Sequence, residues 1–185
     1  MSVTKSEPMP IMEWEAPDFS LVGTSDEEFS LENIEGYNGL LVVFTCNHCP
    51  YARAAWPTLV DLHELYGKEI AFVAINSNDS DTYPEDSFEE MKKRKEEWGI
   101  LFPYLWDESQ EVAEEYQAQC TPDPYLFKYE DGVWKLFYHG RINDNWQHPE
   151  QVKQNNLEDA MVSLLGDEEP PENQPASMGC SIKWK

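Results

Sequence analysis

Basic residues, cysteines and long apolar runs are scarce in this chain, and each shortage excludes a class of protein. The 185 residues contain only 13 Lys and Arg against 36 Asp and Glu, a formal net charge of −23 at pH 7. Such a charge repels nucleic-acid phosphates and anionic lipid surfaces, so we expect neither nucleic acids nor membranes among the partners. The 4 cysteines are too few for a disulfide scaffold.

The sequence also lacks the signals that would carry it into or across a membrane. Its longest apolar runs, 40–44 and 70–75, are far shorter than the about 18 residues of a membrane-spanning helix. The N-terminal segment has neither the apolar region nor the small-residue cleavage site of a secretory signal. We therefore predict a cytoplasmic protein, with a length that suits one domain.

Apolar residues make up 41% of the chain, which is enough for a packed core. Along the sequence, segments with a strand pattern alternate with segments that have a helix pattern. The β-prone runs 40–44 and 70–75 are typical of strands buried on both faces, and the apolar spacing within 52–66 predicts a helix. Asp86 or Ser87 can cap a second helix. The remaining predicted elements are an N-terminal hairpin, a short strand, a third helix, a second hairpin and a last helix, at 19–31, 102–106, 107–119, 125–138 and 150–165.

This order of elements predicts an α/β fold with a central mixed β-sheet flanked by helices, extended by the N-terminal hairpin. We expect residues 1–15 to form a flexible N-terminal arm because they are polar and show no periodicity. The domain itself should span 16–166. Residues 167–185 begin with an acidic, proline-containing linker and continue into a tail that contains Cys180.

A cysteine pair, Cys46-Asn47-His48-Cys49, directly follows the first buried run. Residues three apart at the start of a helix have Cβ atoms about 5 to 6 Å apart, and a small adjustment reaches the ~3.8 Å of a disulfide. In a reducing compartment this spacing indicates redox chemistry or metal binding. The expected mechanism is attack by the Cys46 thiolate on a substrate disulfide, with Cys49 resolving the mixed disulfide and His48 favouring the thiolate.

Pro50 complicates the assignment of the nucleophile. Proline disfavours a helical conformation for the residue before it and suits the first helical turn, so the helix can begin near residue 50. The helix dipole would then help Cys46 less. We still assign Cys46 as the nucleophile because it lies nearer the strand end and is expected to be the more exposed cysteine.

Three segments carry a resemblance to a known family. The runs APDFSL (16–21), CNHCPY (46–51) and YQAQCTPDPYLF (116–127) resemble the thioredoxin superfamily, specifically its AhpC/TSA, peroxiredoxin-like branch. The segments 76–91, 140–145 and 179–184 resemble a subgroup of that branch that carries CNHC. The resemblance spans about residues 16–185 and implies a thioredoxin-like fold and a thiol-disulfide oxidoreductase that needs no cofactor.

The resemblance also implies a substrate groove. The proline that matches the family pattern is Pro122, which in relatives follows a cis peptide bond and faces the cysteine pair. The backbone of the preceding residue, Thr121, would bind extended substrate by strand-like hydrogen bonds. Asn47, Thr121 and Pro122 are therefore the expected substrate-binding residues. The expected partners are a disulfide-containing protein or small-thiol substrate and a thiol reductant.

The sequence departs from the family pattern at two places. Typical peroxiredoxins have Thr three positions before the peroxidatic cysteine, where this chain has Val43. Thioredoxins bury an acid in the strand before the cysteine pair, and the run 40–44 contains none. The base that serves Cys49 is therefore unassigned, with His48 or water as the candidates.

The other two cysteines and one loop are weaker candidates. Cys120 and Cys180 are possible accessory redox thiols, although Cys120 better fits a small buried apolar residue. The loop at 141–145, which includes Arg141, can border the site. His63, His139 and His148 fit no metal-ligand spacing.

Three alternatives to the oxidoreductase remain open. The first is a thiol peroxidase, which the branch favours and Val43 disfavours. The second is a metal-binding or copper-delivery module that uses Cys46, Cys49, His48 and Cys120. The third is a redox-inactive interaction domain that keeps the fold.

Overall fold

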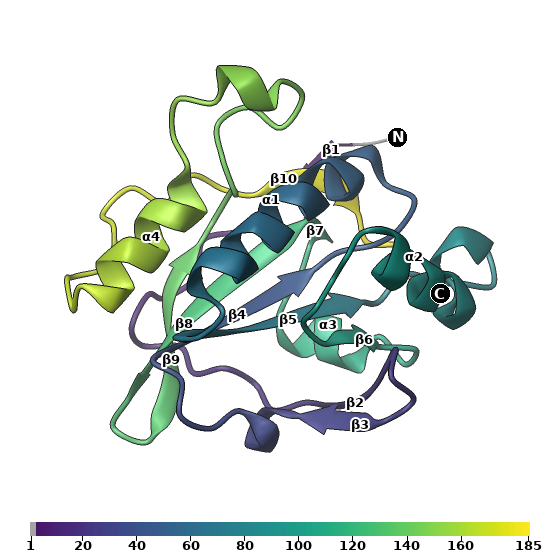
Figure 1. Cartoon of the computed structure of the whole chain (residues 1–185), viewed down its shortest axis with the longest axis horizontal. Coiled ribbons are helices and arrows are strands. Elements are labelled where there is room, and N and C mark those ends of the chain that lie inside the picture. Colours follow the sequence, from purple (N-terminus) through teal and green to yellow (C-terminus); the bar gives the residue numbers. More distant parts are fainter. Residues whose placement is uncertain (1–2) are drawn as a thin grey trace.

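The computed structural model describes residues 3–185 and is built around a seven-stranded mixed sheet (Figure 1). The strand order is β3-β2-β6-β5-β4-β8-β9, in which β4 pairs in parallel with β5 and antiparallel with β8. The strands are β2 (Ser20–Gly23), β3 (Glu28–Ser30), β4 (Gly39–Phe44), β5 (Ile70–Asn76), β6 (Tyr104–Trp106), β8 (Asp123–Glu130) and β9 (Val133–His139). The predicted α/β fold with a central mixed sheet is confirmed.

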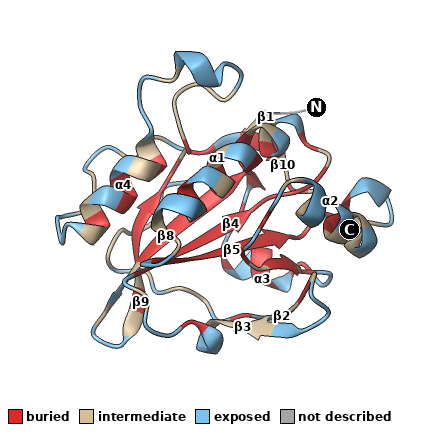
Figure 2. Ribbon diagram, viewed as in Figure 1, coloured by how far each residue is buried: buried red, intermediate tan, exposed pale blue. Residues whose placement is uncertain are grey.

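Helices cover both faces of this sheet, which explains why its central strands are continuously apolar. Leu41 and Val43 of β4 pack on the side of α1 (Pro50–Tyr66), α2 (Phe88–Glu97) and α4 (Asn156–Leu165). Leu40 and Val42 point to the opposite face, where α3 (Glu111–Glu115) packs. Every residue of β4 is buried, as Figure 2 shows. Single 3-10 turns form at Leu31–Asn33, Pro84–Asp86 and Pro149–Gln151.

A second, three-stranded sheet joins the two ends of the chain beside the start of α1 (Figure 1). Its order is β1-β10-β7, with β1 (Val3–Lys5), β10 (Met178–Ser181) and β7 (Cys120–Thr121) all antiparallel. The central strand of this sheet is therefore the C-terminal one. This sheet lies at the end of β4 where the cysteine pair is found.

The ends of the chain differ from the sequence prediction. The residues expected to form a flexible arm, apart from 1–2, which lie outside the described residues, are tied to the domain. The Met12 N–H donates to the Leu136 carbonyl at 2.7 Å, and Trp14 packs its ring 5.7 Å from that of Tyr116. The expected tail contains β10. The two terminal segments show no periodic sequence pattern, because contacts with distant parts of the chain hold each of them in place.

Two helices are shorter than expected. The last helix begins at Asn156 rather than near 150, after the separate turn at Pro149–Gln151. The third helix spans Glu111–Glu115 instead of 107–119. Asp107, the first residue of the predicted range, lies before the helix and accepts hydrogen bonds from the Ala113 N–H at 2.9 Å and the Ser77 hydroxyl at 2.8 Å. Among residues 3–185, no helix is long and apolar enough to cross a membrane.

Candidate functional site

The cysteine pair occupies the turn between β4 and α1. The helix begins at Pro50 with Cys49 as its N-cap, as the conformational preference of proline predicted. Cys46 therefore lies before the helix, and its carbonyl accepts a hydrogen bond from the Trp56 indole at 3.3 Å. Both cysteines are 0% exposed, so the prediction that Cys46 is the more exposed one is wrong.

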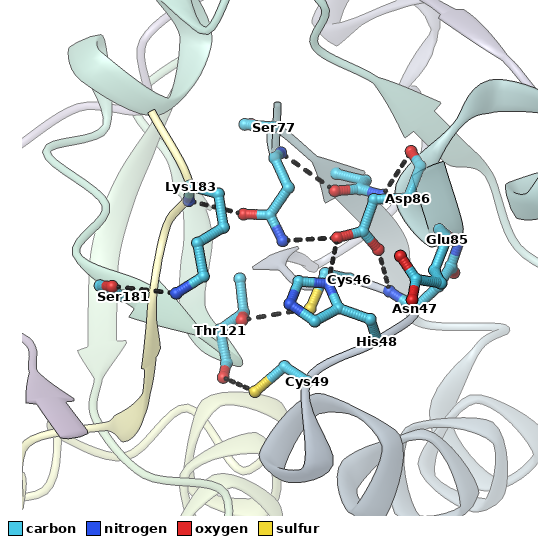
Figure 3. A network of polar contacts seen from close by, with 12 residues as sticks. Cys46, Asn47, His48, Cys49, Ser77, Glu85, Asp86, Thr121, Ser181 and Lys183 are labelled. Carbon is cyan, nitrogen blue, oxygen red and sulfur yellow. Dashed lines mark hydrogen bonds and ion pairs between the residues drawn. The ribbon is translucent and has the colours of Figure 1, made fainter. Parts of the chain in front are cut away.

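The Thr121-Pro122 peptide lies against the cysteine pair and is cis, as the resemblance implied (Figure 3). The Cys46 sulfur is 3.3 Å from the Thr121 hydroxyl. The Cys49 sulfur is 3.5 Å from the Thr121 carbonyl oxygen, which accepts a hydrogen bond from the thiol when Cys49 is protonated. Thr121 thus contacts both sulfur atoms, one through its side chain and the other through its backbone.

A buried carboxylate, Asp86, lies on the other side of Cys46 (Figure 3). It accepts hydrogen bonds from the Asn47 N–H at 2.7 Å and the Asn78 amide at 2.8 Å, and it pairs with Nδ1 of His48. The hydrogen bond with Asp86 raises the pKa of His48 above its usual value. The sequence pattern indicates a role for Asp86 only as a helix cap. Ser87 fills that role, because its hydroxyl accepts the Glu90 N–H.

The side chain of Asn47 is held by hydrogen bonds within the protein. Its amide nitrogen donates to the Glu85 carbonyl at 2.9 Å, and its amide oxygen accepts from the Tyr104 hydroxyl at 2.9 Å. Both polar ends of the side chain are therefore engaged within the protein, and the residue is 3% exposed. Asn47 thus holds the turn against the 3-10 segment that carries Asp86.

The two sulfur atoms of the pair have opposite acidities. Hydrogen bonds from the Cys46 and Cys180 thiols, together with the Ala52 backbone N–H, lower the pKa of Cys49 to about 5. Burial raises the pKa of Cys46 well above its usual value, and the hydrogen bond that it gives to Cys49 and the charge of Asp86 act in the same direction. The negative charge of the reduced pair therefore lies on Cys49, at the helix N-terminus.

The two remaining cysteines have different environments. The sulfur of Cys120 is 3.7 Å from both the Ser177 hydroxyl and the Pro122 carbonyl oxygen, and burial raises the pKa of its thiol. Cys180, on β10, donates a hydrogen bond to Cys49, and burial together with that bond raises its pKa to about 12. The structure thus groups Cys180 with Cys46 and Cys49, and it leaves Cys120 outside the group. Cys46, Cys49 and Cys120 are not part of a disulfide.

A cavity of about 300 Å³ lies on the far side of Pro122 and Tyr51, and its lining includes neither Cys46 nor Cys49. Tyr51 of α1 and Trp146 line it with ring centroids 3.9 Å apart, and Pro122 contributes to the same wall. Arg141, Asn143 and Asp144 of the predicted bordering loop also line this cavity. The other member of that loop, Asn145, accepts the His148 N–H instead.

Donor atoms of Cys46, His48 and Asp86 lie within 4.8 Å of one another. A thiolate and an imidazole suit zinc or copper. This set differs from the one expected from the sequence, because Cys49 and Cys120 are absent from it and Asp86 is added.

Comparisons with known proteins agree with this geometry. The AhpC/TSA family profile matches residues 12–135. A crystal structure of an uncharacterized conserved protein from Geobacillus kaustophilus is 40% identical, with a TM-score of 0.92 over 100% of this chain and 97% of that one. A hypothetical protein from Sinorhizobium meliloti 1021 is 34% identical, with a TM-score of 0.91 over 98% of each chain.

A curated relative is the thioredoxin-like protein YneN of Bacillus subtilis strain 168. It is 29% identical over 119 residues, which are 64% of this chain and 66% of YneN. The match thus covers just under two thirds of that relative's length. Its name agrees with the thioredoxin-like fold of this chain.

Proposed function

Because this chain belongs to the AhpC/TSA family and carries its cysteine pair against a cis-proline, we propose that it is a thiol-disulfide oxidoreductase. Cys46 and Cys49 would alternate between a dithiol and a disulfide. The observation that carries the proposal is the position of Cys49 at the N-cap of α1, where hydrogen bonds from the Cys46 and Cys180 thiols and the Ala52 N–H stabilise its thiolate.

The proposed mechanism exchanges the roles expected from the sequence. The Cys49 thiolate attacks one sulfur of a substrate disulfide, and the other substrate sulfur leaves as a thiolate. Cys46 then loses its proton and attacks Cys49, which releases the second substrate thiol and leaves a Cys46–Cys49 disulfide. Two electrons pass to the substrate. The His48–Asp86 pair beside Cys46 is suited to take that thiol proton.

The proposed substrate is a disulfide-containing protein or small-thiol disulfide, and a separate thiol reductant restores the dithiol. Tyr51, Trp146 and Pro122 offer an apolar wall to side chains that flank the substrate disulfide. The backbone of Thr121 offers strand-like hydrogen bonds to an extended segment. Membership of the AhpC/TSA family keeps a thiol peroxidase as the alternative reaction of the same thiolate.

Trapping the mixed disulfide tests which cysteine attacks. Two double variants, Cys46→Ser/Cys180→Ser and Cys49→Ser/Cys180→Ser, are incubated with oxidised glutathione and analysed by intact mass after acid quenching. Cys180 is removed from both because its thiol contacts Cys49. We expect the variant that keeps Cys49 to hold one glutathione, and to acquire it at least about tenfold faster than the variant that keeps Cys46.

The opposite ranking would return the nucleophile to Cys46. If neither variant holds glutathione or a disulfide-bonded peptide, the oxidoreductase proposal is wrong. Wild-type protein provides the control, since it should form the Cys46–Cys49 disulfide without retaining an adduct.

The donor set of Cys46, His48 and Asp86 supports metal binding as a second candidate function. A bound soft cation would replace the thiol proton of Cys46 and compete with the His48–Asp86 hydrogen bond. The reduced protein would then purify with about one equivalent of zinc or copper, measured by elemental analysis, and Asp86→Asn would lose much of it. Metal-free protein that cannot be loaded by added zinc or Cu(I) would exclude this function.

A further inference from the structure

The strand β10 occupies the place in which the proposed function puts an extended substrate. It pairs antiparallel with β7, with Cys180 opposite Thr121 and Ser181 opposite Cys120. A free strand edge at Thr121 would offer its backbone groups to an incoming segment. In this chain the C-terminal segment already forms that pairing, directly before the cis-proline.

The fit between β10 and Thr121 is too close for any residue but glycine at position 179. A Cβ atom on Gly179 would lie 2.1 Å from the Thr121 carbonyl oxygen and 2.6 Å from its carbonyl carbon. Real Cβ atoms do not approach backbone atoms so closely. The absence of a side chain at Gly179 is therefore what lets β10 bring the next residue, Cys180, over the cysteine pair.

The sulfur of Cys180 is directed at the pair. Cys180 is 2% exposed and packs with Cys46, Cys49 and Ala52. Its thiol is within hydrogen-bonding range of the Cys49 sulfur. A thiol so placed needs only side-chain rotation to approach the about 2.05 Å of a disulfide bond.

Hydrogen bonds on both flanks hold β10 in this position. Before the strand, the Ser177 N–H donates to the Ser6 hydroxyl at 3.0 Å, and the Ser177 hydroxyl donates to the buried Asp123. After it, the Lys183 N–H donates to the Asn78 side chain at 2.9 Å. These hydrogen bonds anchor β10 within the site, so this segment is not a loose tail on the surface.

We infer that β10 acts as an internal substrate and that Cys180 is a third redox thiol, which exchanges with the Cys46–Cys49 disulfide to form a Cys49–Cys180 disulfide. The inference rests on the proposed function, because that reaction supplies the Cys46–Cys49 disulfide. The inference gives Cys180 a chemical step that the proposed reaction of Cys46 and Cys49 with substrate does not require.

The exchange conserves electrons and needs no external oxidant. Cys180 gives up its proton and its sulfur attacks the Cys49 sulfur, so that a Cys49–Cys180 bond forms as the Cys46–Cys49 bond breaks. The bonding electrons leave with Cys46, which takes up a proton. The proton that Cys180 gives up balances the one that Cys46 takes up, and the ring of His48 lies beside Cys46.

A variant without Cys46 isolates this step. In Cys46→Ser, oxidised glutathione should first attach to Cys49, after which Cys180 should displace the glutathione and form the Cys49–Cys180 disulfide. Peptide mapping under non-reducing conditions identifies the linked cysteines. We expect this disulfide to account for nearly all oxidised Cys46→Ser protein, with at least about tenfold less retained glutathione than in Cys46→Ser/Cys180→Ser.

Two further variants make the result specific. Cys46→Ser/Cys120→Ser should behave as Cys46→Ser does, because Cys120 faces Ser177 rather than the pair. Glutathione retained equally by Cys46→Ser and Cys46→Ser/Cys180→Ser would overturn the role of Cys180 while leaving the proposed function intact. A failure of the double variant to acquire glutathione at all would instead contradict the proposed attack by Cys49.

Discussion

Replacing Gly179 with alanine is expected to raise the rate at which iodoacetamide alkylates Cys49 by about tenfold or more. In the wild-type protein both cysteines of the pair are 0% exposed beneath β10, so alkylation waits for a local opening. The added Cβ would lie 2.1 Å from the Thr121 carbonyl oxygen, which forces β10 away from β7. Mass spectrometry of timed, quenched samples gives the rate for each cysteine.

Ser181→Ala is the matched control for this substitution. Ser181 lies on the same strand and its side chain accepts only a hydrogen bond from Lys183 at 3.2 Å, so removing the hydroxyl leaves β10 in place. Its alkylation rate should stay close to that of the wild type. If Gly179→Ala keeps a native circular dichroism spectrum and melting transition but reacts no faster, β10 does not limit access to Cys49.

Titration of the reduced wild-type protein should reveal a thiolate that forms near pH 5. The pKa of Cys49 is lowered to about 5, so about 99% of this sulfur is ionised at neutral pH, against a few per cent for an ordinary cysteine. The ultraviolet absorbance of the thiolate reports this directly and needs no reagent to enter the site. The absorbance should rise as pH increases through 5, and Cys49→Ser should lose that step.

The neighbouring thiols set the position of this inflection. Cys46→Ala and Cys180→Ala each remove a hydrogen-bond donor to the Cys49 sulfur, so each should move the inflection to higher pH. Cys120→Ala should leave it unchanged, since Cys120 does not contact Cys49. A wild-type inflection near the ordinary cysteine pKa would contradict the assignment of the charge to Cys49.

The parts of the structure that could be predicted are those determined by neighbouring residues. The continuous apolar run of β4 reflects helices on both faces of the sheet, and this requirement is visible in the sequence alone. The start of α1 follows from the conformational limits that Pro50 places on itself and on Cys49. The same limit places Cys49 and not Cys46 at the helix N-terminus, which is the basis for proposing Cys49 as the nucleophile.

The parts that could not be predicted depend on contacts between distant segments. Asp86 lies 39 residues from Asn47 along the chain and reaches the site through a 3-10 turn, so no local pattern connects it to His48. The strand before the cysteine pair, in which thioredoxins bury an acid, does not contain Asp86. The pairing of Cys180 with Thr121 is likewise a long-range event, and β10 has no alternation that would mark it as a strand.

Covalent attachment of β10 to the rest of the chain decides how it competes with molecules from solution. Only residues 166–177 separate the end of α4 from the start of β10, so the strand is tethered close to its groove. A short tether corresponds to an effective concentration of about the millimolar order. A dilute extended peptide that relies on reversible pairing alone is outcompeted by this strand, whereas a molecule that captures the Cys49 sulfur covalently during a brief opening can keep its place.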